Sequence, residues 1–293
     1  MHEIFRTNRN KSEFLRRLQG ESFSPKHGAI ARYLAQEYRA AAFLTAAELA
    51  ATTGVSEATV TRFALSLGYR GYPELRRHLH RIVKEELTSL DLLALPLRKR
   101  GRPRDALTSV VETEMRNLSA LVREMPREEL SRVVKGMLVA RRIYVVGHMA
   151  SAALARSFGY SLSKIHDDVV TITEAGRAAL DAFRSVPATA CLIAIGFPRY
   201  PRDTLELMEF AREEDVTIVA LTDSFLSPLA KRADLVLTVQ TDLVSFVDSH
   251  CAPLALLTAL LVEWSLRARE RTEAMLDRFE RLARRHALFH SSE

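Results

Sequence analysis

A glycine and a serine that follow a run of apolar residues have the types and spacing of an anion site. Residues 140–165 read ARRIYVVGHMASAALARSFGYSLSKI, which predicts a strand, a turn at Gly147 and a helix with Ser151 near its start. Backbone N–H groups at a helix start, together with a hydroxyl, hold phosphate esters. No G-x-x-G follows Gly147 and the lysine of a P-loop is absent, so the segment predicts neither a dinucleotide site nor a P-loop.

Three residues could exchange protons with a ligand in an isomerisation, which needs a general base and a ring-opening acid. His166 begins the polar turn HDD, which is typical of a solvated loop. His250 stands at the start of a long apolar helix and could touch a ligand, and Glu263 lies deep in that helix. No His, Asp or Glu pair at i, i+4 spacing is backed by a third ligand, so we predict no metal site and no cofactor.

The two cysteines, Cys191 and Cys251, cannot form a disulfide framework or a zinc site of cysteines alone. Each lies among apolar neighbours, in TACLIAI and HCAPLALL. We therefore expect both to be buried thiols.

The elements that must position these residues begin after residue 140, where short apolar runs alternate with helical stretches. Strands are expected at 143–147, 168–173, 189–197, 216–223 and 235–241, and helices at 152–165, 176–185, 203–214 and 247–266. Near-continuous apolar strands separated by amphipathic helices indicate a doubly wound parallel sheet of five strands, covered on both faces.

The positive charge of the chain is concentrated at one end. Of 293 residues, 42 are Lys or Arg and 36 are Asp or Glu, and the net charge is +6 in residues 1–85, +2 in residues 86–140 and −2 in residues 141–293. A basic module attached to a nearly neutral one predicts that only the first module meets a polyanion.

The basic end carries the spacing of a helix-turn-helix. Within residues 44–75 the small Ala50, the turn glycine Gly54 and the apolar Val60 follow the pattern A-x3-G-x5-V, and Ser56 is placed to cap the second helix. We therefore expect an all-α DNA-binding domain whose second helix enters the major groove of double-stranded DNA.

Short hydroxyls and an arginine at the front of that helix suit base and phosphate contacts. The expected DNA-binding residues are Ser56, Thr59, Thr61 and Arg62 on this helix, all on its outer face, and Arg70, Arg76 and Arg77 after it.

Composition along the chain predicts the domain organisation. The expected parts are a helix-turn-helix domain at 1–87, a linker with two prolines and a basic cluster at 88–106, connecting helices at 107–140, the α/β domain at 141–266 and a helical tail at 267–293.

Neither the opening segment nor the apolar helix predicts a membrane protein. The opening MHEIFRTNRNKSEFLRRL is too charged for a signal peptide, and residues 251–264 fall short of the roughly 20 apolar residues of a membrane span. We expect a cytoplasmic protein without membrane contact, in which this helix packs in the core or in a subunit interface and the amphipathic tail forms a second contact helix.

Three segments together resemble a known family. TGVSEATVTRFALSLGYRGYPELR, ARRIYVVGHMASAALA and ALTDSFLSPLAKRADLVL occur in this order, and they closely resemble the RpiR/MurR family of bacterial transcription regulators. The resemblance implies a helix-turn-helix domain joined to a sugar isomerase (SIS) domain that senses a phosphorylated sugar or a related anionic metabolite, and a homodimer or homotetramer.

The resemblance also implies where the effector binds. The first SIS phosphate loop is matched by Gly147 and Ser151. The second loop, usually S-x-S-G-x-T, is matched by GFPRYPRDT at 196–204, which has Gly196 and Pro198 where serines would stand. Arginines add positive charge there. The expected effector-binding residues are Gly147, His148, Ser151, Arg199, Thr204 and His250.

We therefore predict a DNA-binding regulator of a carbohydrate or related metabolic operon, and not an enzyme. The alternative is a sugar-phosphate isomerase with an accessory helical domain. The regulator is favoured because a housekeeping isomerase has no use for the DNA-binding half.

Overall fold

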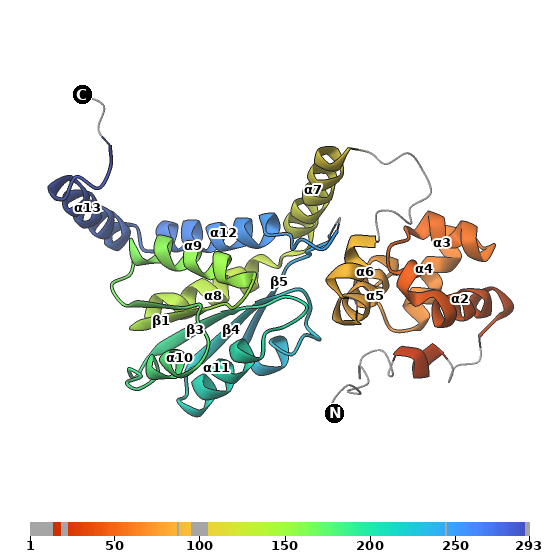
Figure 1. Cartoon of the computed structure of the whole chain (residues 1–293), viewed down its shortest axis with the longest axis horizontal. Coiled ribbons are helices and arrows are strands. Elements are labelled where there is room, and N and C mark those ends of the chain that lie inside the picture. The colour runs from red at the N-terminus through yellow and green to blue at the C-terminus, as the bar shows by residue number, and fades with distance from the viewer. Residues whose placement is uncertain (1–13, 19–22, 87, 95–104, 244, 291–293) are drawn as a thin grey trace. The chain divides into compact units, whose positions relative to one another are not determined.

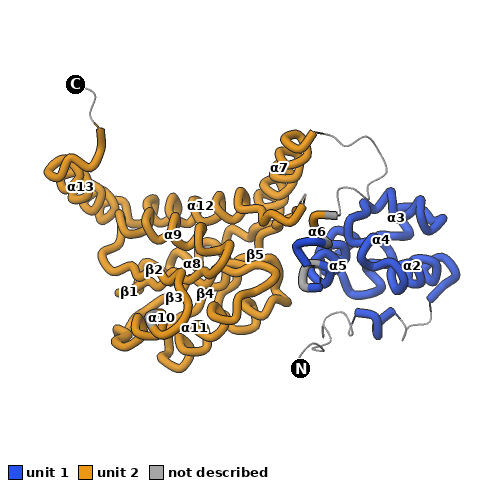
Figure 2. The backbone as a smooth tube through the Cα atoms, in the orientation of Figure 1, with its two compact units in different colours: residues 1–92 blue, residues 93–293 orange. Residues whose placement is uncertain are grey.

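The computed structural model describes residues 14–18, 23–86, 88–94, 105–243 and 245–290 (Figure 1). The chain divides into two compact units, residues 1–92 and residues 93–293 (Figure 2). The basic excess of residues 1–85 therefore falls within the first unit.

The first unit is helical. Its helices are α2 (Pro25–Ala41), α3 (Ala46–Thr53), α4 (Glu57–Ser66), α5 (Tyr72–Glu86) and α6 (Ser89–Ala94). Ile30 and Leu34 of α2, Phe63 of α4 and Leu75 and Leu79 of α5 have no exposed surface. These side chains form one apolar core that fixes α4 against its neighbours.

Local signals around the turn between α3 and α4 are confirmed. Thr45 and Glu48 form a capping box, because the Glu48 N–H donates to the Thr45 hydroxyl and the Thr45 N–H donates to the Glu48 carboxylate. Gly54 ends α3 with a left-handed φ of 69°, which glycine adopts without strain. Ser56 caps α4 by accepting from the Thr59 N–H at 3.3 Å.

The second unit is a five-stranded parallel sheet with helices on both faces, as the sequence predicts (Figure 1). Its strands are β1 (Arg142–Val146), β2 (Val169–Ile172), β3 (Ala190–Ile195), β4 (Thr217–Thr222) and β5 (Leu235–Thr238), in the order β2-β1-β3-β4-β5. Its α-helices are α7 (Ala106–Glu124), α8 (Arg127–Val139), α9 (Ser151–Ser163), α10 (Arg177–Asp181), α11 (Arg202–Glu213), α12 (Cys251–Arg267) and α13 (Arg269–Arg285).

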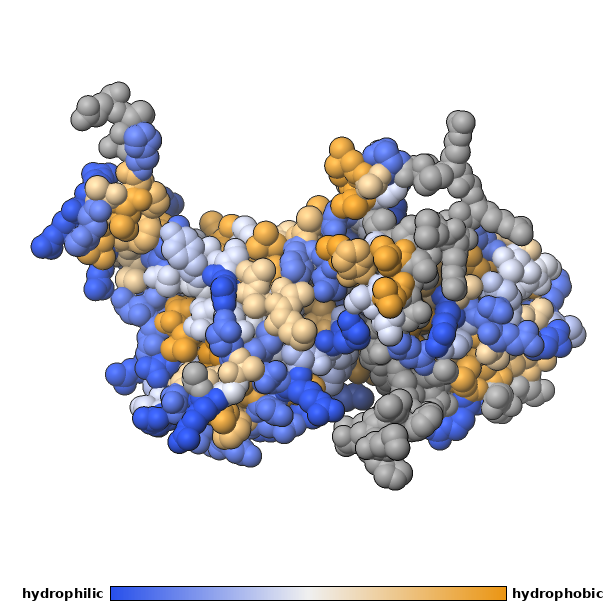
Figure 3. All heavy atoms as spheres, in the orientation of Figure 1, coloured by the Kyte–Doolittle hydropathy of each residue, from blue (hydrophilic) through white to orange (hydrophobic). Residues whose placement is uncertain are grey.

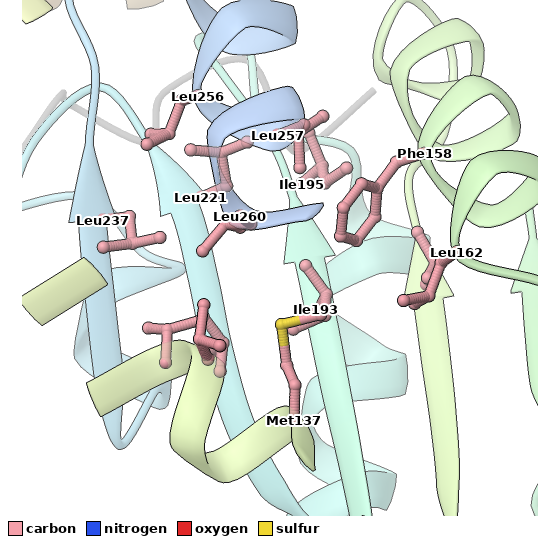
Figure 4. Close-up of a cluster of buried hydrophobic side chains, with 14 of the residues drawn as sticks. Met137, Phe158, Leu162, Ile193, Ile195, Leu221, Leu237, Leu256, Leu257 and Leu260 are labelled. Atoms are coloured by element: carbon pink, nitrogen blue, oxygen red, sulfur yellow. The ribbon is translucent and has the colours of Figure 1, made fainter. Parts of the chain in front are cut away.

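Alternate strand residues serve two cores. On one face Ile193 and Leu221 pack with Met137 of α8, Phe158 of α9 and Leu257 of α12 (Figure 4). On the other face Tyr144, Leu192 and Ala220 pack with Phe183 and with Leu207 of α11. Because both faces are covered, nearly every strand position is apolar, which is why the sequence alternates so little there.

Some sequence expectations differ from the structure. The expected helix at 176–185 is only Arg177–Asp181, and the expected helix at 247–266 begins at Cys251. Residues 89–94 of the expected linker form α6, and residues 95–104 lie outside the described residues.

Burial also differs from expectation at two positions. Cys191 is buried as expected, but Cys251 is exposed because it is the first residue of α12, where the helix meets solvent. His166 is buried at 2% exposure, whereas the HDD turn predicted a solvated residue.

Within the described residues no single helix is long and apolar enough to cross a membrane, and α12 with α13 meets that test only as a pair bent by 110°. The same residues contain no group of three or more His, Cys, Asp or Glu side chains placed to hold a metal ion.

Gly159 allows α9 to lie directly on β2. A Cβ atom at Gly159 would stand 2.0 Å from the Thr171 Oγ1 and 3.2 Å from its Cβ. At Gly136, in the last turn of α8, a Cβ would meet nothing within 4 Å. Gly159 is buried and Gly136 half-buried, and only Gly159 lacks space for a side chain.

We expect Gly159→Ala to destabilise the second unit by about 1–3 kcal/mol, because the Thr171 side chain must turn away or α9 must move off the sheet. Gly136→Ala should instead stabilise it by about 0.5–1 kcal/mol, since alanine loses less backbone entropy than glycine when the helix forms and meets no clash here. Urea denaturation followed by the fluorescence of Trp264, the single tryptophan, reports on this unit. Equal effects of the two substitutions would show that the close approach does not matter.

Candidate functional site

Helix α4 presents one polar end to solvent. Ser56, Thr61 and Arg62 are exposed, whereas Val60 and Phe63 are fully buried. Thr59 is only 5% exposed, so the expectation that it stays on the outer face is wrong. Thr59 faces the unit because it stands one helical turn before the buried Phe63, on the same side of the helix.

Thr59 instead organises its exposed neighbours. Its hydroxyl lies 2.9 Å from the Ser56 Oγ and accepts from the Arg62 guanidinium at 3.3 Å. The capping serine and the arginine are thus joined through one buried side chain. This arrangement reduces the freedom of Arg62 before it meets a ligand, which lowers the entropy that binding costs.

The three arginines after α4 differ in exposure. Arg70 is exposed, and its backbone N–H donates to the Glu74 carboxylate at 2.6 Å. Arg76 is half-buried with its Nε 3.4 Å from the Ala42 carbonyl, and Arg77 is half-buried. Arg70 is therefore the most accessible of the three.

His78, also on α5, contributes no positive charge. Burial, together with the charges of Arg81 and Arg17, lowers the pKa of His78 to about 3. Its Nδ1 lies beside the Tyr69 hydroxyl, which can donate to the neutral ring.

The second candidate site lies at the carboxyl edge of the sheet. The chain runs from β1 outward to β2 and then returns to β3 on the other side of β1. At such a reversal the loops after the two central strands diverge and leave a crevice in which ligands of open α/β sheets bind. The loops after β1 and β3 carry most of the expected effector residues.

His148 and Thr204 meet across that reversal. The His148 Nδ1 lies 2.8 Å from the Thr204 Oγ1, and its Nε2 lies 3.3 Å from the Glu174 carbonyl. His148 is 3% exposed and Thr204 has no exposed surface. His148 thus joins the loop after β1 to Thr204, 56 positions later in the sequence, and to the loop after β2.

The first loop is tightly wrapped around the start of α9. A Cβ at Gly147 would lie 2.7 Å from the Ser151 carbonyl oxygen and 3.1 Å from the Ala155 Cβ, so this position requires glycine. Ser151 is the first residue of α9 and is 5% exposed. The Ser151 N–H donates to the His148 carbonyl, which leaves its hydroxyl as the group that can face a ligand.

The second loop is anchored by a pair that the sequence analysis missed. The Tyr200 hydroxyl donates to the Asp223 carboxylate at 2.7 Å, and the Thr222 hydroxyl donates to the same oxygen at 3.2 Å. Arg199 and Arg202 are exposed on this loop and at the start of α11. Asp223 is the last residue of the strand expected at 216–223, and that position could have indicated its place at the carboxyl edge.

His250 is the N-cap residue of α12 and is half-buried. The loop before it is tied to α7: the Asn117 amide donates to the Asp242 carbonyl at 3.2 Å, and Ser249 donates to the Glu114 carboxylate at 2.7 Å. Asn117 has no exposed surface. No sequence motif indicated this network.

The three residues considered for acid–base chemistry do not converge. The His166 Nε2 contacts the Ala140 carbonyl, and its Nδ1 accepts from the Asp168 N–H, at the amino edge of the sheet. Glu263 pairs with Arg267 at 2.6 Å. It lies 13 residues along α12 from His250, about 20 Å at the helical rise.

Two family models match the chain. The model described as a helix-turn-helix domain of the rpiR family matches residues 14–86, and the SIS domain model matches residues 136–263. The regulator HexR of Pseudomonas aeruginosa is 25% identical over 243 residues, which are 81% of this chain and 83% of that protein.

Solved structures agree with the fold. The sugar isomerase domain of an RpiR transcription factor from Sphaerobacter thermophilus is 30% identical with a TM-score of 0.59, covering 61% of this chain and 99% of that one. The Vibrio vulnificus NanR protein complexed with ManNAc-6P is 23% identical with a TM-score of 0.58, covering 92% of this chain and 98% of that one.

Proposed function

Because this chain belongs to the RpiR family of helix-turn-helix transcriptional regulators with a SIS domain, we propose that α4 binds operator DNA and that a small phosphorylated metabolite controls this binding. The observation that carries the effector part is the meeting of His148 and Thr204 at the strand reversal. The regulated genes then belong to a carbohydrate or related pathway.

Charge and geometry support the DNA-binding part. The first unit holds the basic excess, and the exposed end of α4 presents Ser56, Thr61 and Arg62. An N-terminal helix end of this kind enters the major groove, where arginine pairs with guanine or phosphate. Thr59 acts by holding Arg62, and Arg70 is the best placed of the following arginines for a phosphate.

We expect Arg62→Ala to weaken binding to a duplex, selected from random sequence by the wild-type protein, by about tenfold to hundredfold. Fluorescence anisotropy at fixed salt measures the affinity. The matched control is Arg116→Ala, since Arg116 makes the same i, i+3 bond to a threonine, Thr113, on a helix of the other unit. Unchanged affinity for Arg62→Ala, or an equal loss for Arg116→Ala, would remove Arg62 from the DNA contact.

The carboxyl edge of the sheet supports an anionic effector. Ser151 offers a hydroxyl at the start of α9, Thr204 lies in the first turn of α11, and Arg199 and Arg202 are exposed beside it. NanR, which has this fold, is complexed with a sugar phosphate, ManNAc-6P. We infer that a phosphate monoester of a sugar or a related metabolite binds here, with His250 near the rim.

We expect Ser151→Ala to raise the dissociation constant of the effector about tenfold or more, because a hydrogen bond to a charged group is worth about 1.5–3 kcal/mol. Thermal-shift titration against a panel of sugar phosphates that includes ManNAc-6P identifies a ligand and measures the change. Ser157→Ala, exposed on the same helix, is the control. Equal affinity of the Ser151 variant and wild type for every ligand found would reject the first-loop assignment.

The same geometry favours a sensor over an isomerase. His166, His250 and Glu263 occupy separate places, so these three residues do not supply an acid and a base to one substrate. A regulator that binds DNA acts in the cytoplasm, where we place the protein.

The outer surface of α12 and α13 supports a two-fold dimer. A groove of about 460 Å³ lies between α9, α12 and α13, and beside it Val262, Leu266 and Leu276 are 55%, 73% and 39% exposed. Apolar side chains are visible over α12 and α13 in Figure 3. Arg269 and Glu273 form an ion pair at the groove, so both signs of charge are present there. This suits a self-complementary contact with a second copy.

We expect Leu266→Glu to halve the molecular mass in solution, because the charge cannot be buried in an apolar interface. Light scattering after size exclusion should give at least twice the chain mass of 33.0 kDa for wild type. Leu180→Glu, on α10 at the opposite face of the sheet, should leave the mass unchanged. A monomeric wild type, or an intact oligomer of the Leu266 variant, would contradict the proposal.

A further inference from the structure

His148 is bonded on both ring nitrogens, and the partners restrict where its protons lie. The Glu174 carbonyl can only accept, so the Nε2 of His148 must carry a hydrogen. The Thr204 hydroxyl can either donate or accept. The protonation of Nδ1 therefore decides whether the Thr204 hydroxyl donates to the ring or accepts from it.

In the neutral ring Nδ1 has a lone pair, and Thr204 donates its single hydroxyl proton to it. That proton is then unavailable to a ligand. When the ring takes up a proton, Nδ1–H donates to the Thr204 oxygen instead, and the hydroxyl proton is no longer bound to the ring. The protonated ring also adds a positive charge to the site.

We propose that His148 is the residue that determines which ligands the site accepts, by making anion binding through Thr204 depend on uptake of one proton from solvent. The inference rests on the proposed effector site. The ligand class is a dianion, such as sulfate or the dianionic form of a phosphate monoester, because its second charge compensates the imidazolium. A neutral sugar gains nothing from the protonated ring.

The charged groups around His148 allow this uptake. Glu174, whose carbonyl accepts from the ring, has its carboxylate paired with Arg156 at 2.6 Å. Arg202 and Asp203 flank Thr204 on the first turn of α11. The loop after β3 adds Arg199, and the end of β4 adds Asp223, which accepts from Tyr200. These three acids and three arginines leave the site close to neutral before an anion binds.

Sodium sulfate is a suitable probe, since sulfate remains a dianion from pH 5.5 to 8.5. Thermal shifts of the full-length protein give an apparent dissociation constant at each pH, against sodium chloride of equal ionic strength. Sulfate also stabilises proteins by exclusion from their surface, and the response of Ser151→Ala supplies that background. The dissociation constant of wild type should rise about tenfold for each pH unit on the alkaline side of histidine titration.

His148→Gln should bind sulfate with no pH dependence, because the amide can replace one bond of the ring but cannot take up a proton. His166→Gln is the matched control, since His166 is equally buried and bonded on both nitrogens at the other edge of the sheet, and it should keep the wild-type slope. Calorimetry of wild type in two buffers with different ionisation enthalpies should give an uptake of one proton per site, whether or not the variants fold.

The experiment distinguishes failure of the His148 proposal from failure of the proposed effector site. Sulfate binding that Ser151→Ala weakens, but that shows no pH slope and no proton uptake, would overturn the role of His148 and leave the effector site standing. The same slope in His148→Gln as in wild type would also overturn it. No difference between wild type and Ser151→Ala with sulfate or with any sugar phosphate at any pH would overturn the effector site, and this inference with it.

Discussion

The sensor half depends on the reversal of strand order between β1 and β3. Because the connections after these neighbouring strands lead to opposite faces, α9 packs on one face and α11 on the other. The first turns of both helices then lie at one edge, the place where ligands of open α/β sheets bind. The sheet brings together residues as distant in sequence as His148 and Thr204, and no local feature of either segment could do so.

Packing on the two faces leaves the polar groups of this edge with few choices. A parallel strand buried on both sides has no room for polar side chains along its length, so polar residues collect where strands end. Asp223 follows β4 directly, and His148 follows β1 after one glycine. The same constraint acts on the loop before α12, where Asp242 and Ser249 reach Asn117 and Glu114 of α7. A shift of this loop must therefore move α7 or break these hydrogen bonds. In sequence, α7 is the first helix of the second unit.

Local sequence patterns predicted the helix ends and the strands. The burial of single residues depends on contacts that are distant in the sequence, and it could not be predicted. The turn at Gly54, the caps at Thr45 and Ser56 and the five strands depend on residues next to one another, so their patterns are readable. The burial of Thr59 depends on which side of α4 meets α2 and α5, and a shift of one position changes the answer. His166 looked solvated because its partner, the Ala140 carbonyl, is 26 residues away.

The second phosphate loop shows how packing can change a ligand site. The family pattern places serines where this chain has Gly196 and Pro198. A Cβ at position 196 would lie 2.7 Å from the Leu229 side chain, which is fully buried in the core around α11. A serine at 196 therefore requires Leu229 to move, at a cost in packing. This loop has lost the hydroxyls of the family pattern, and its remaining Thr204 hydroxyl is hydrogen-bonded to His148 of the first loop. The two loops must therefore be considered as one site.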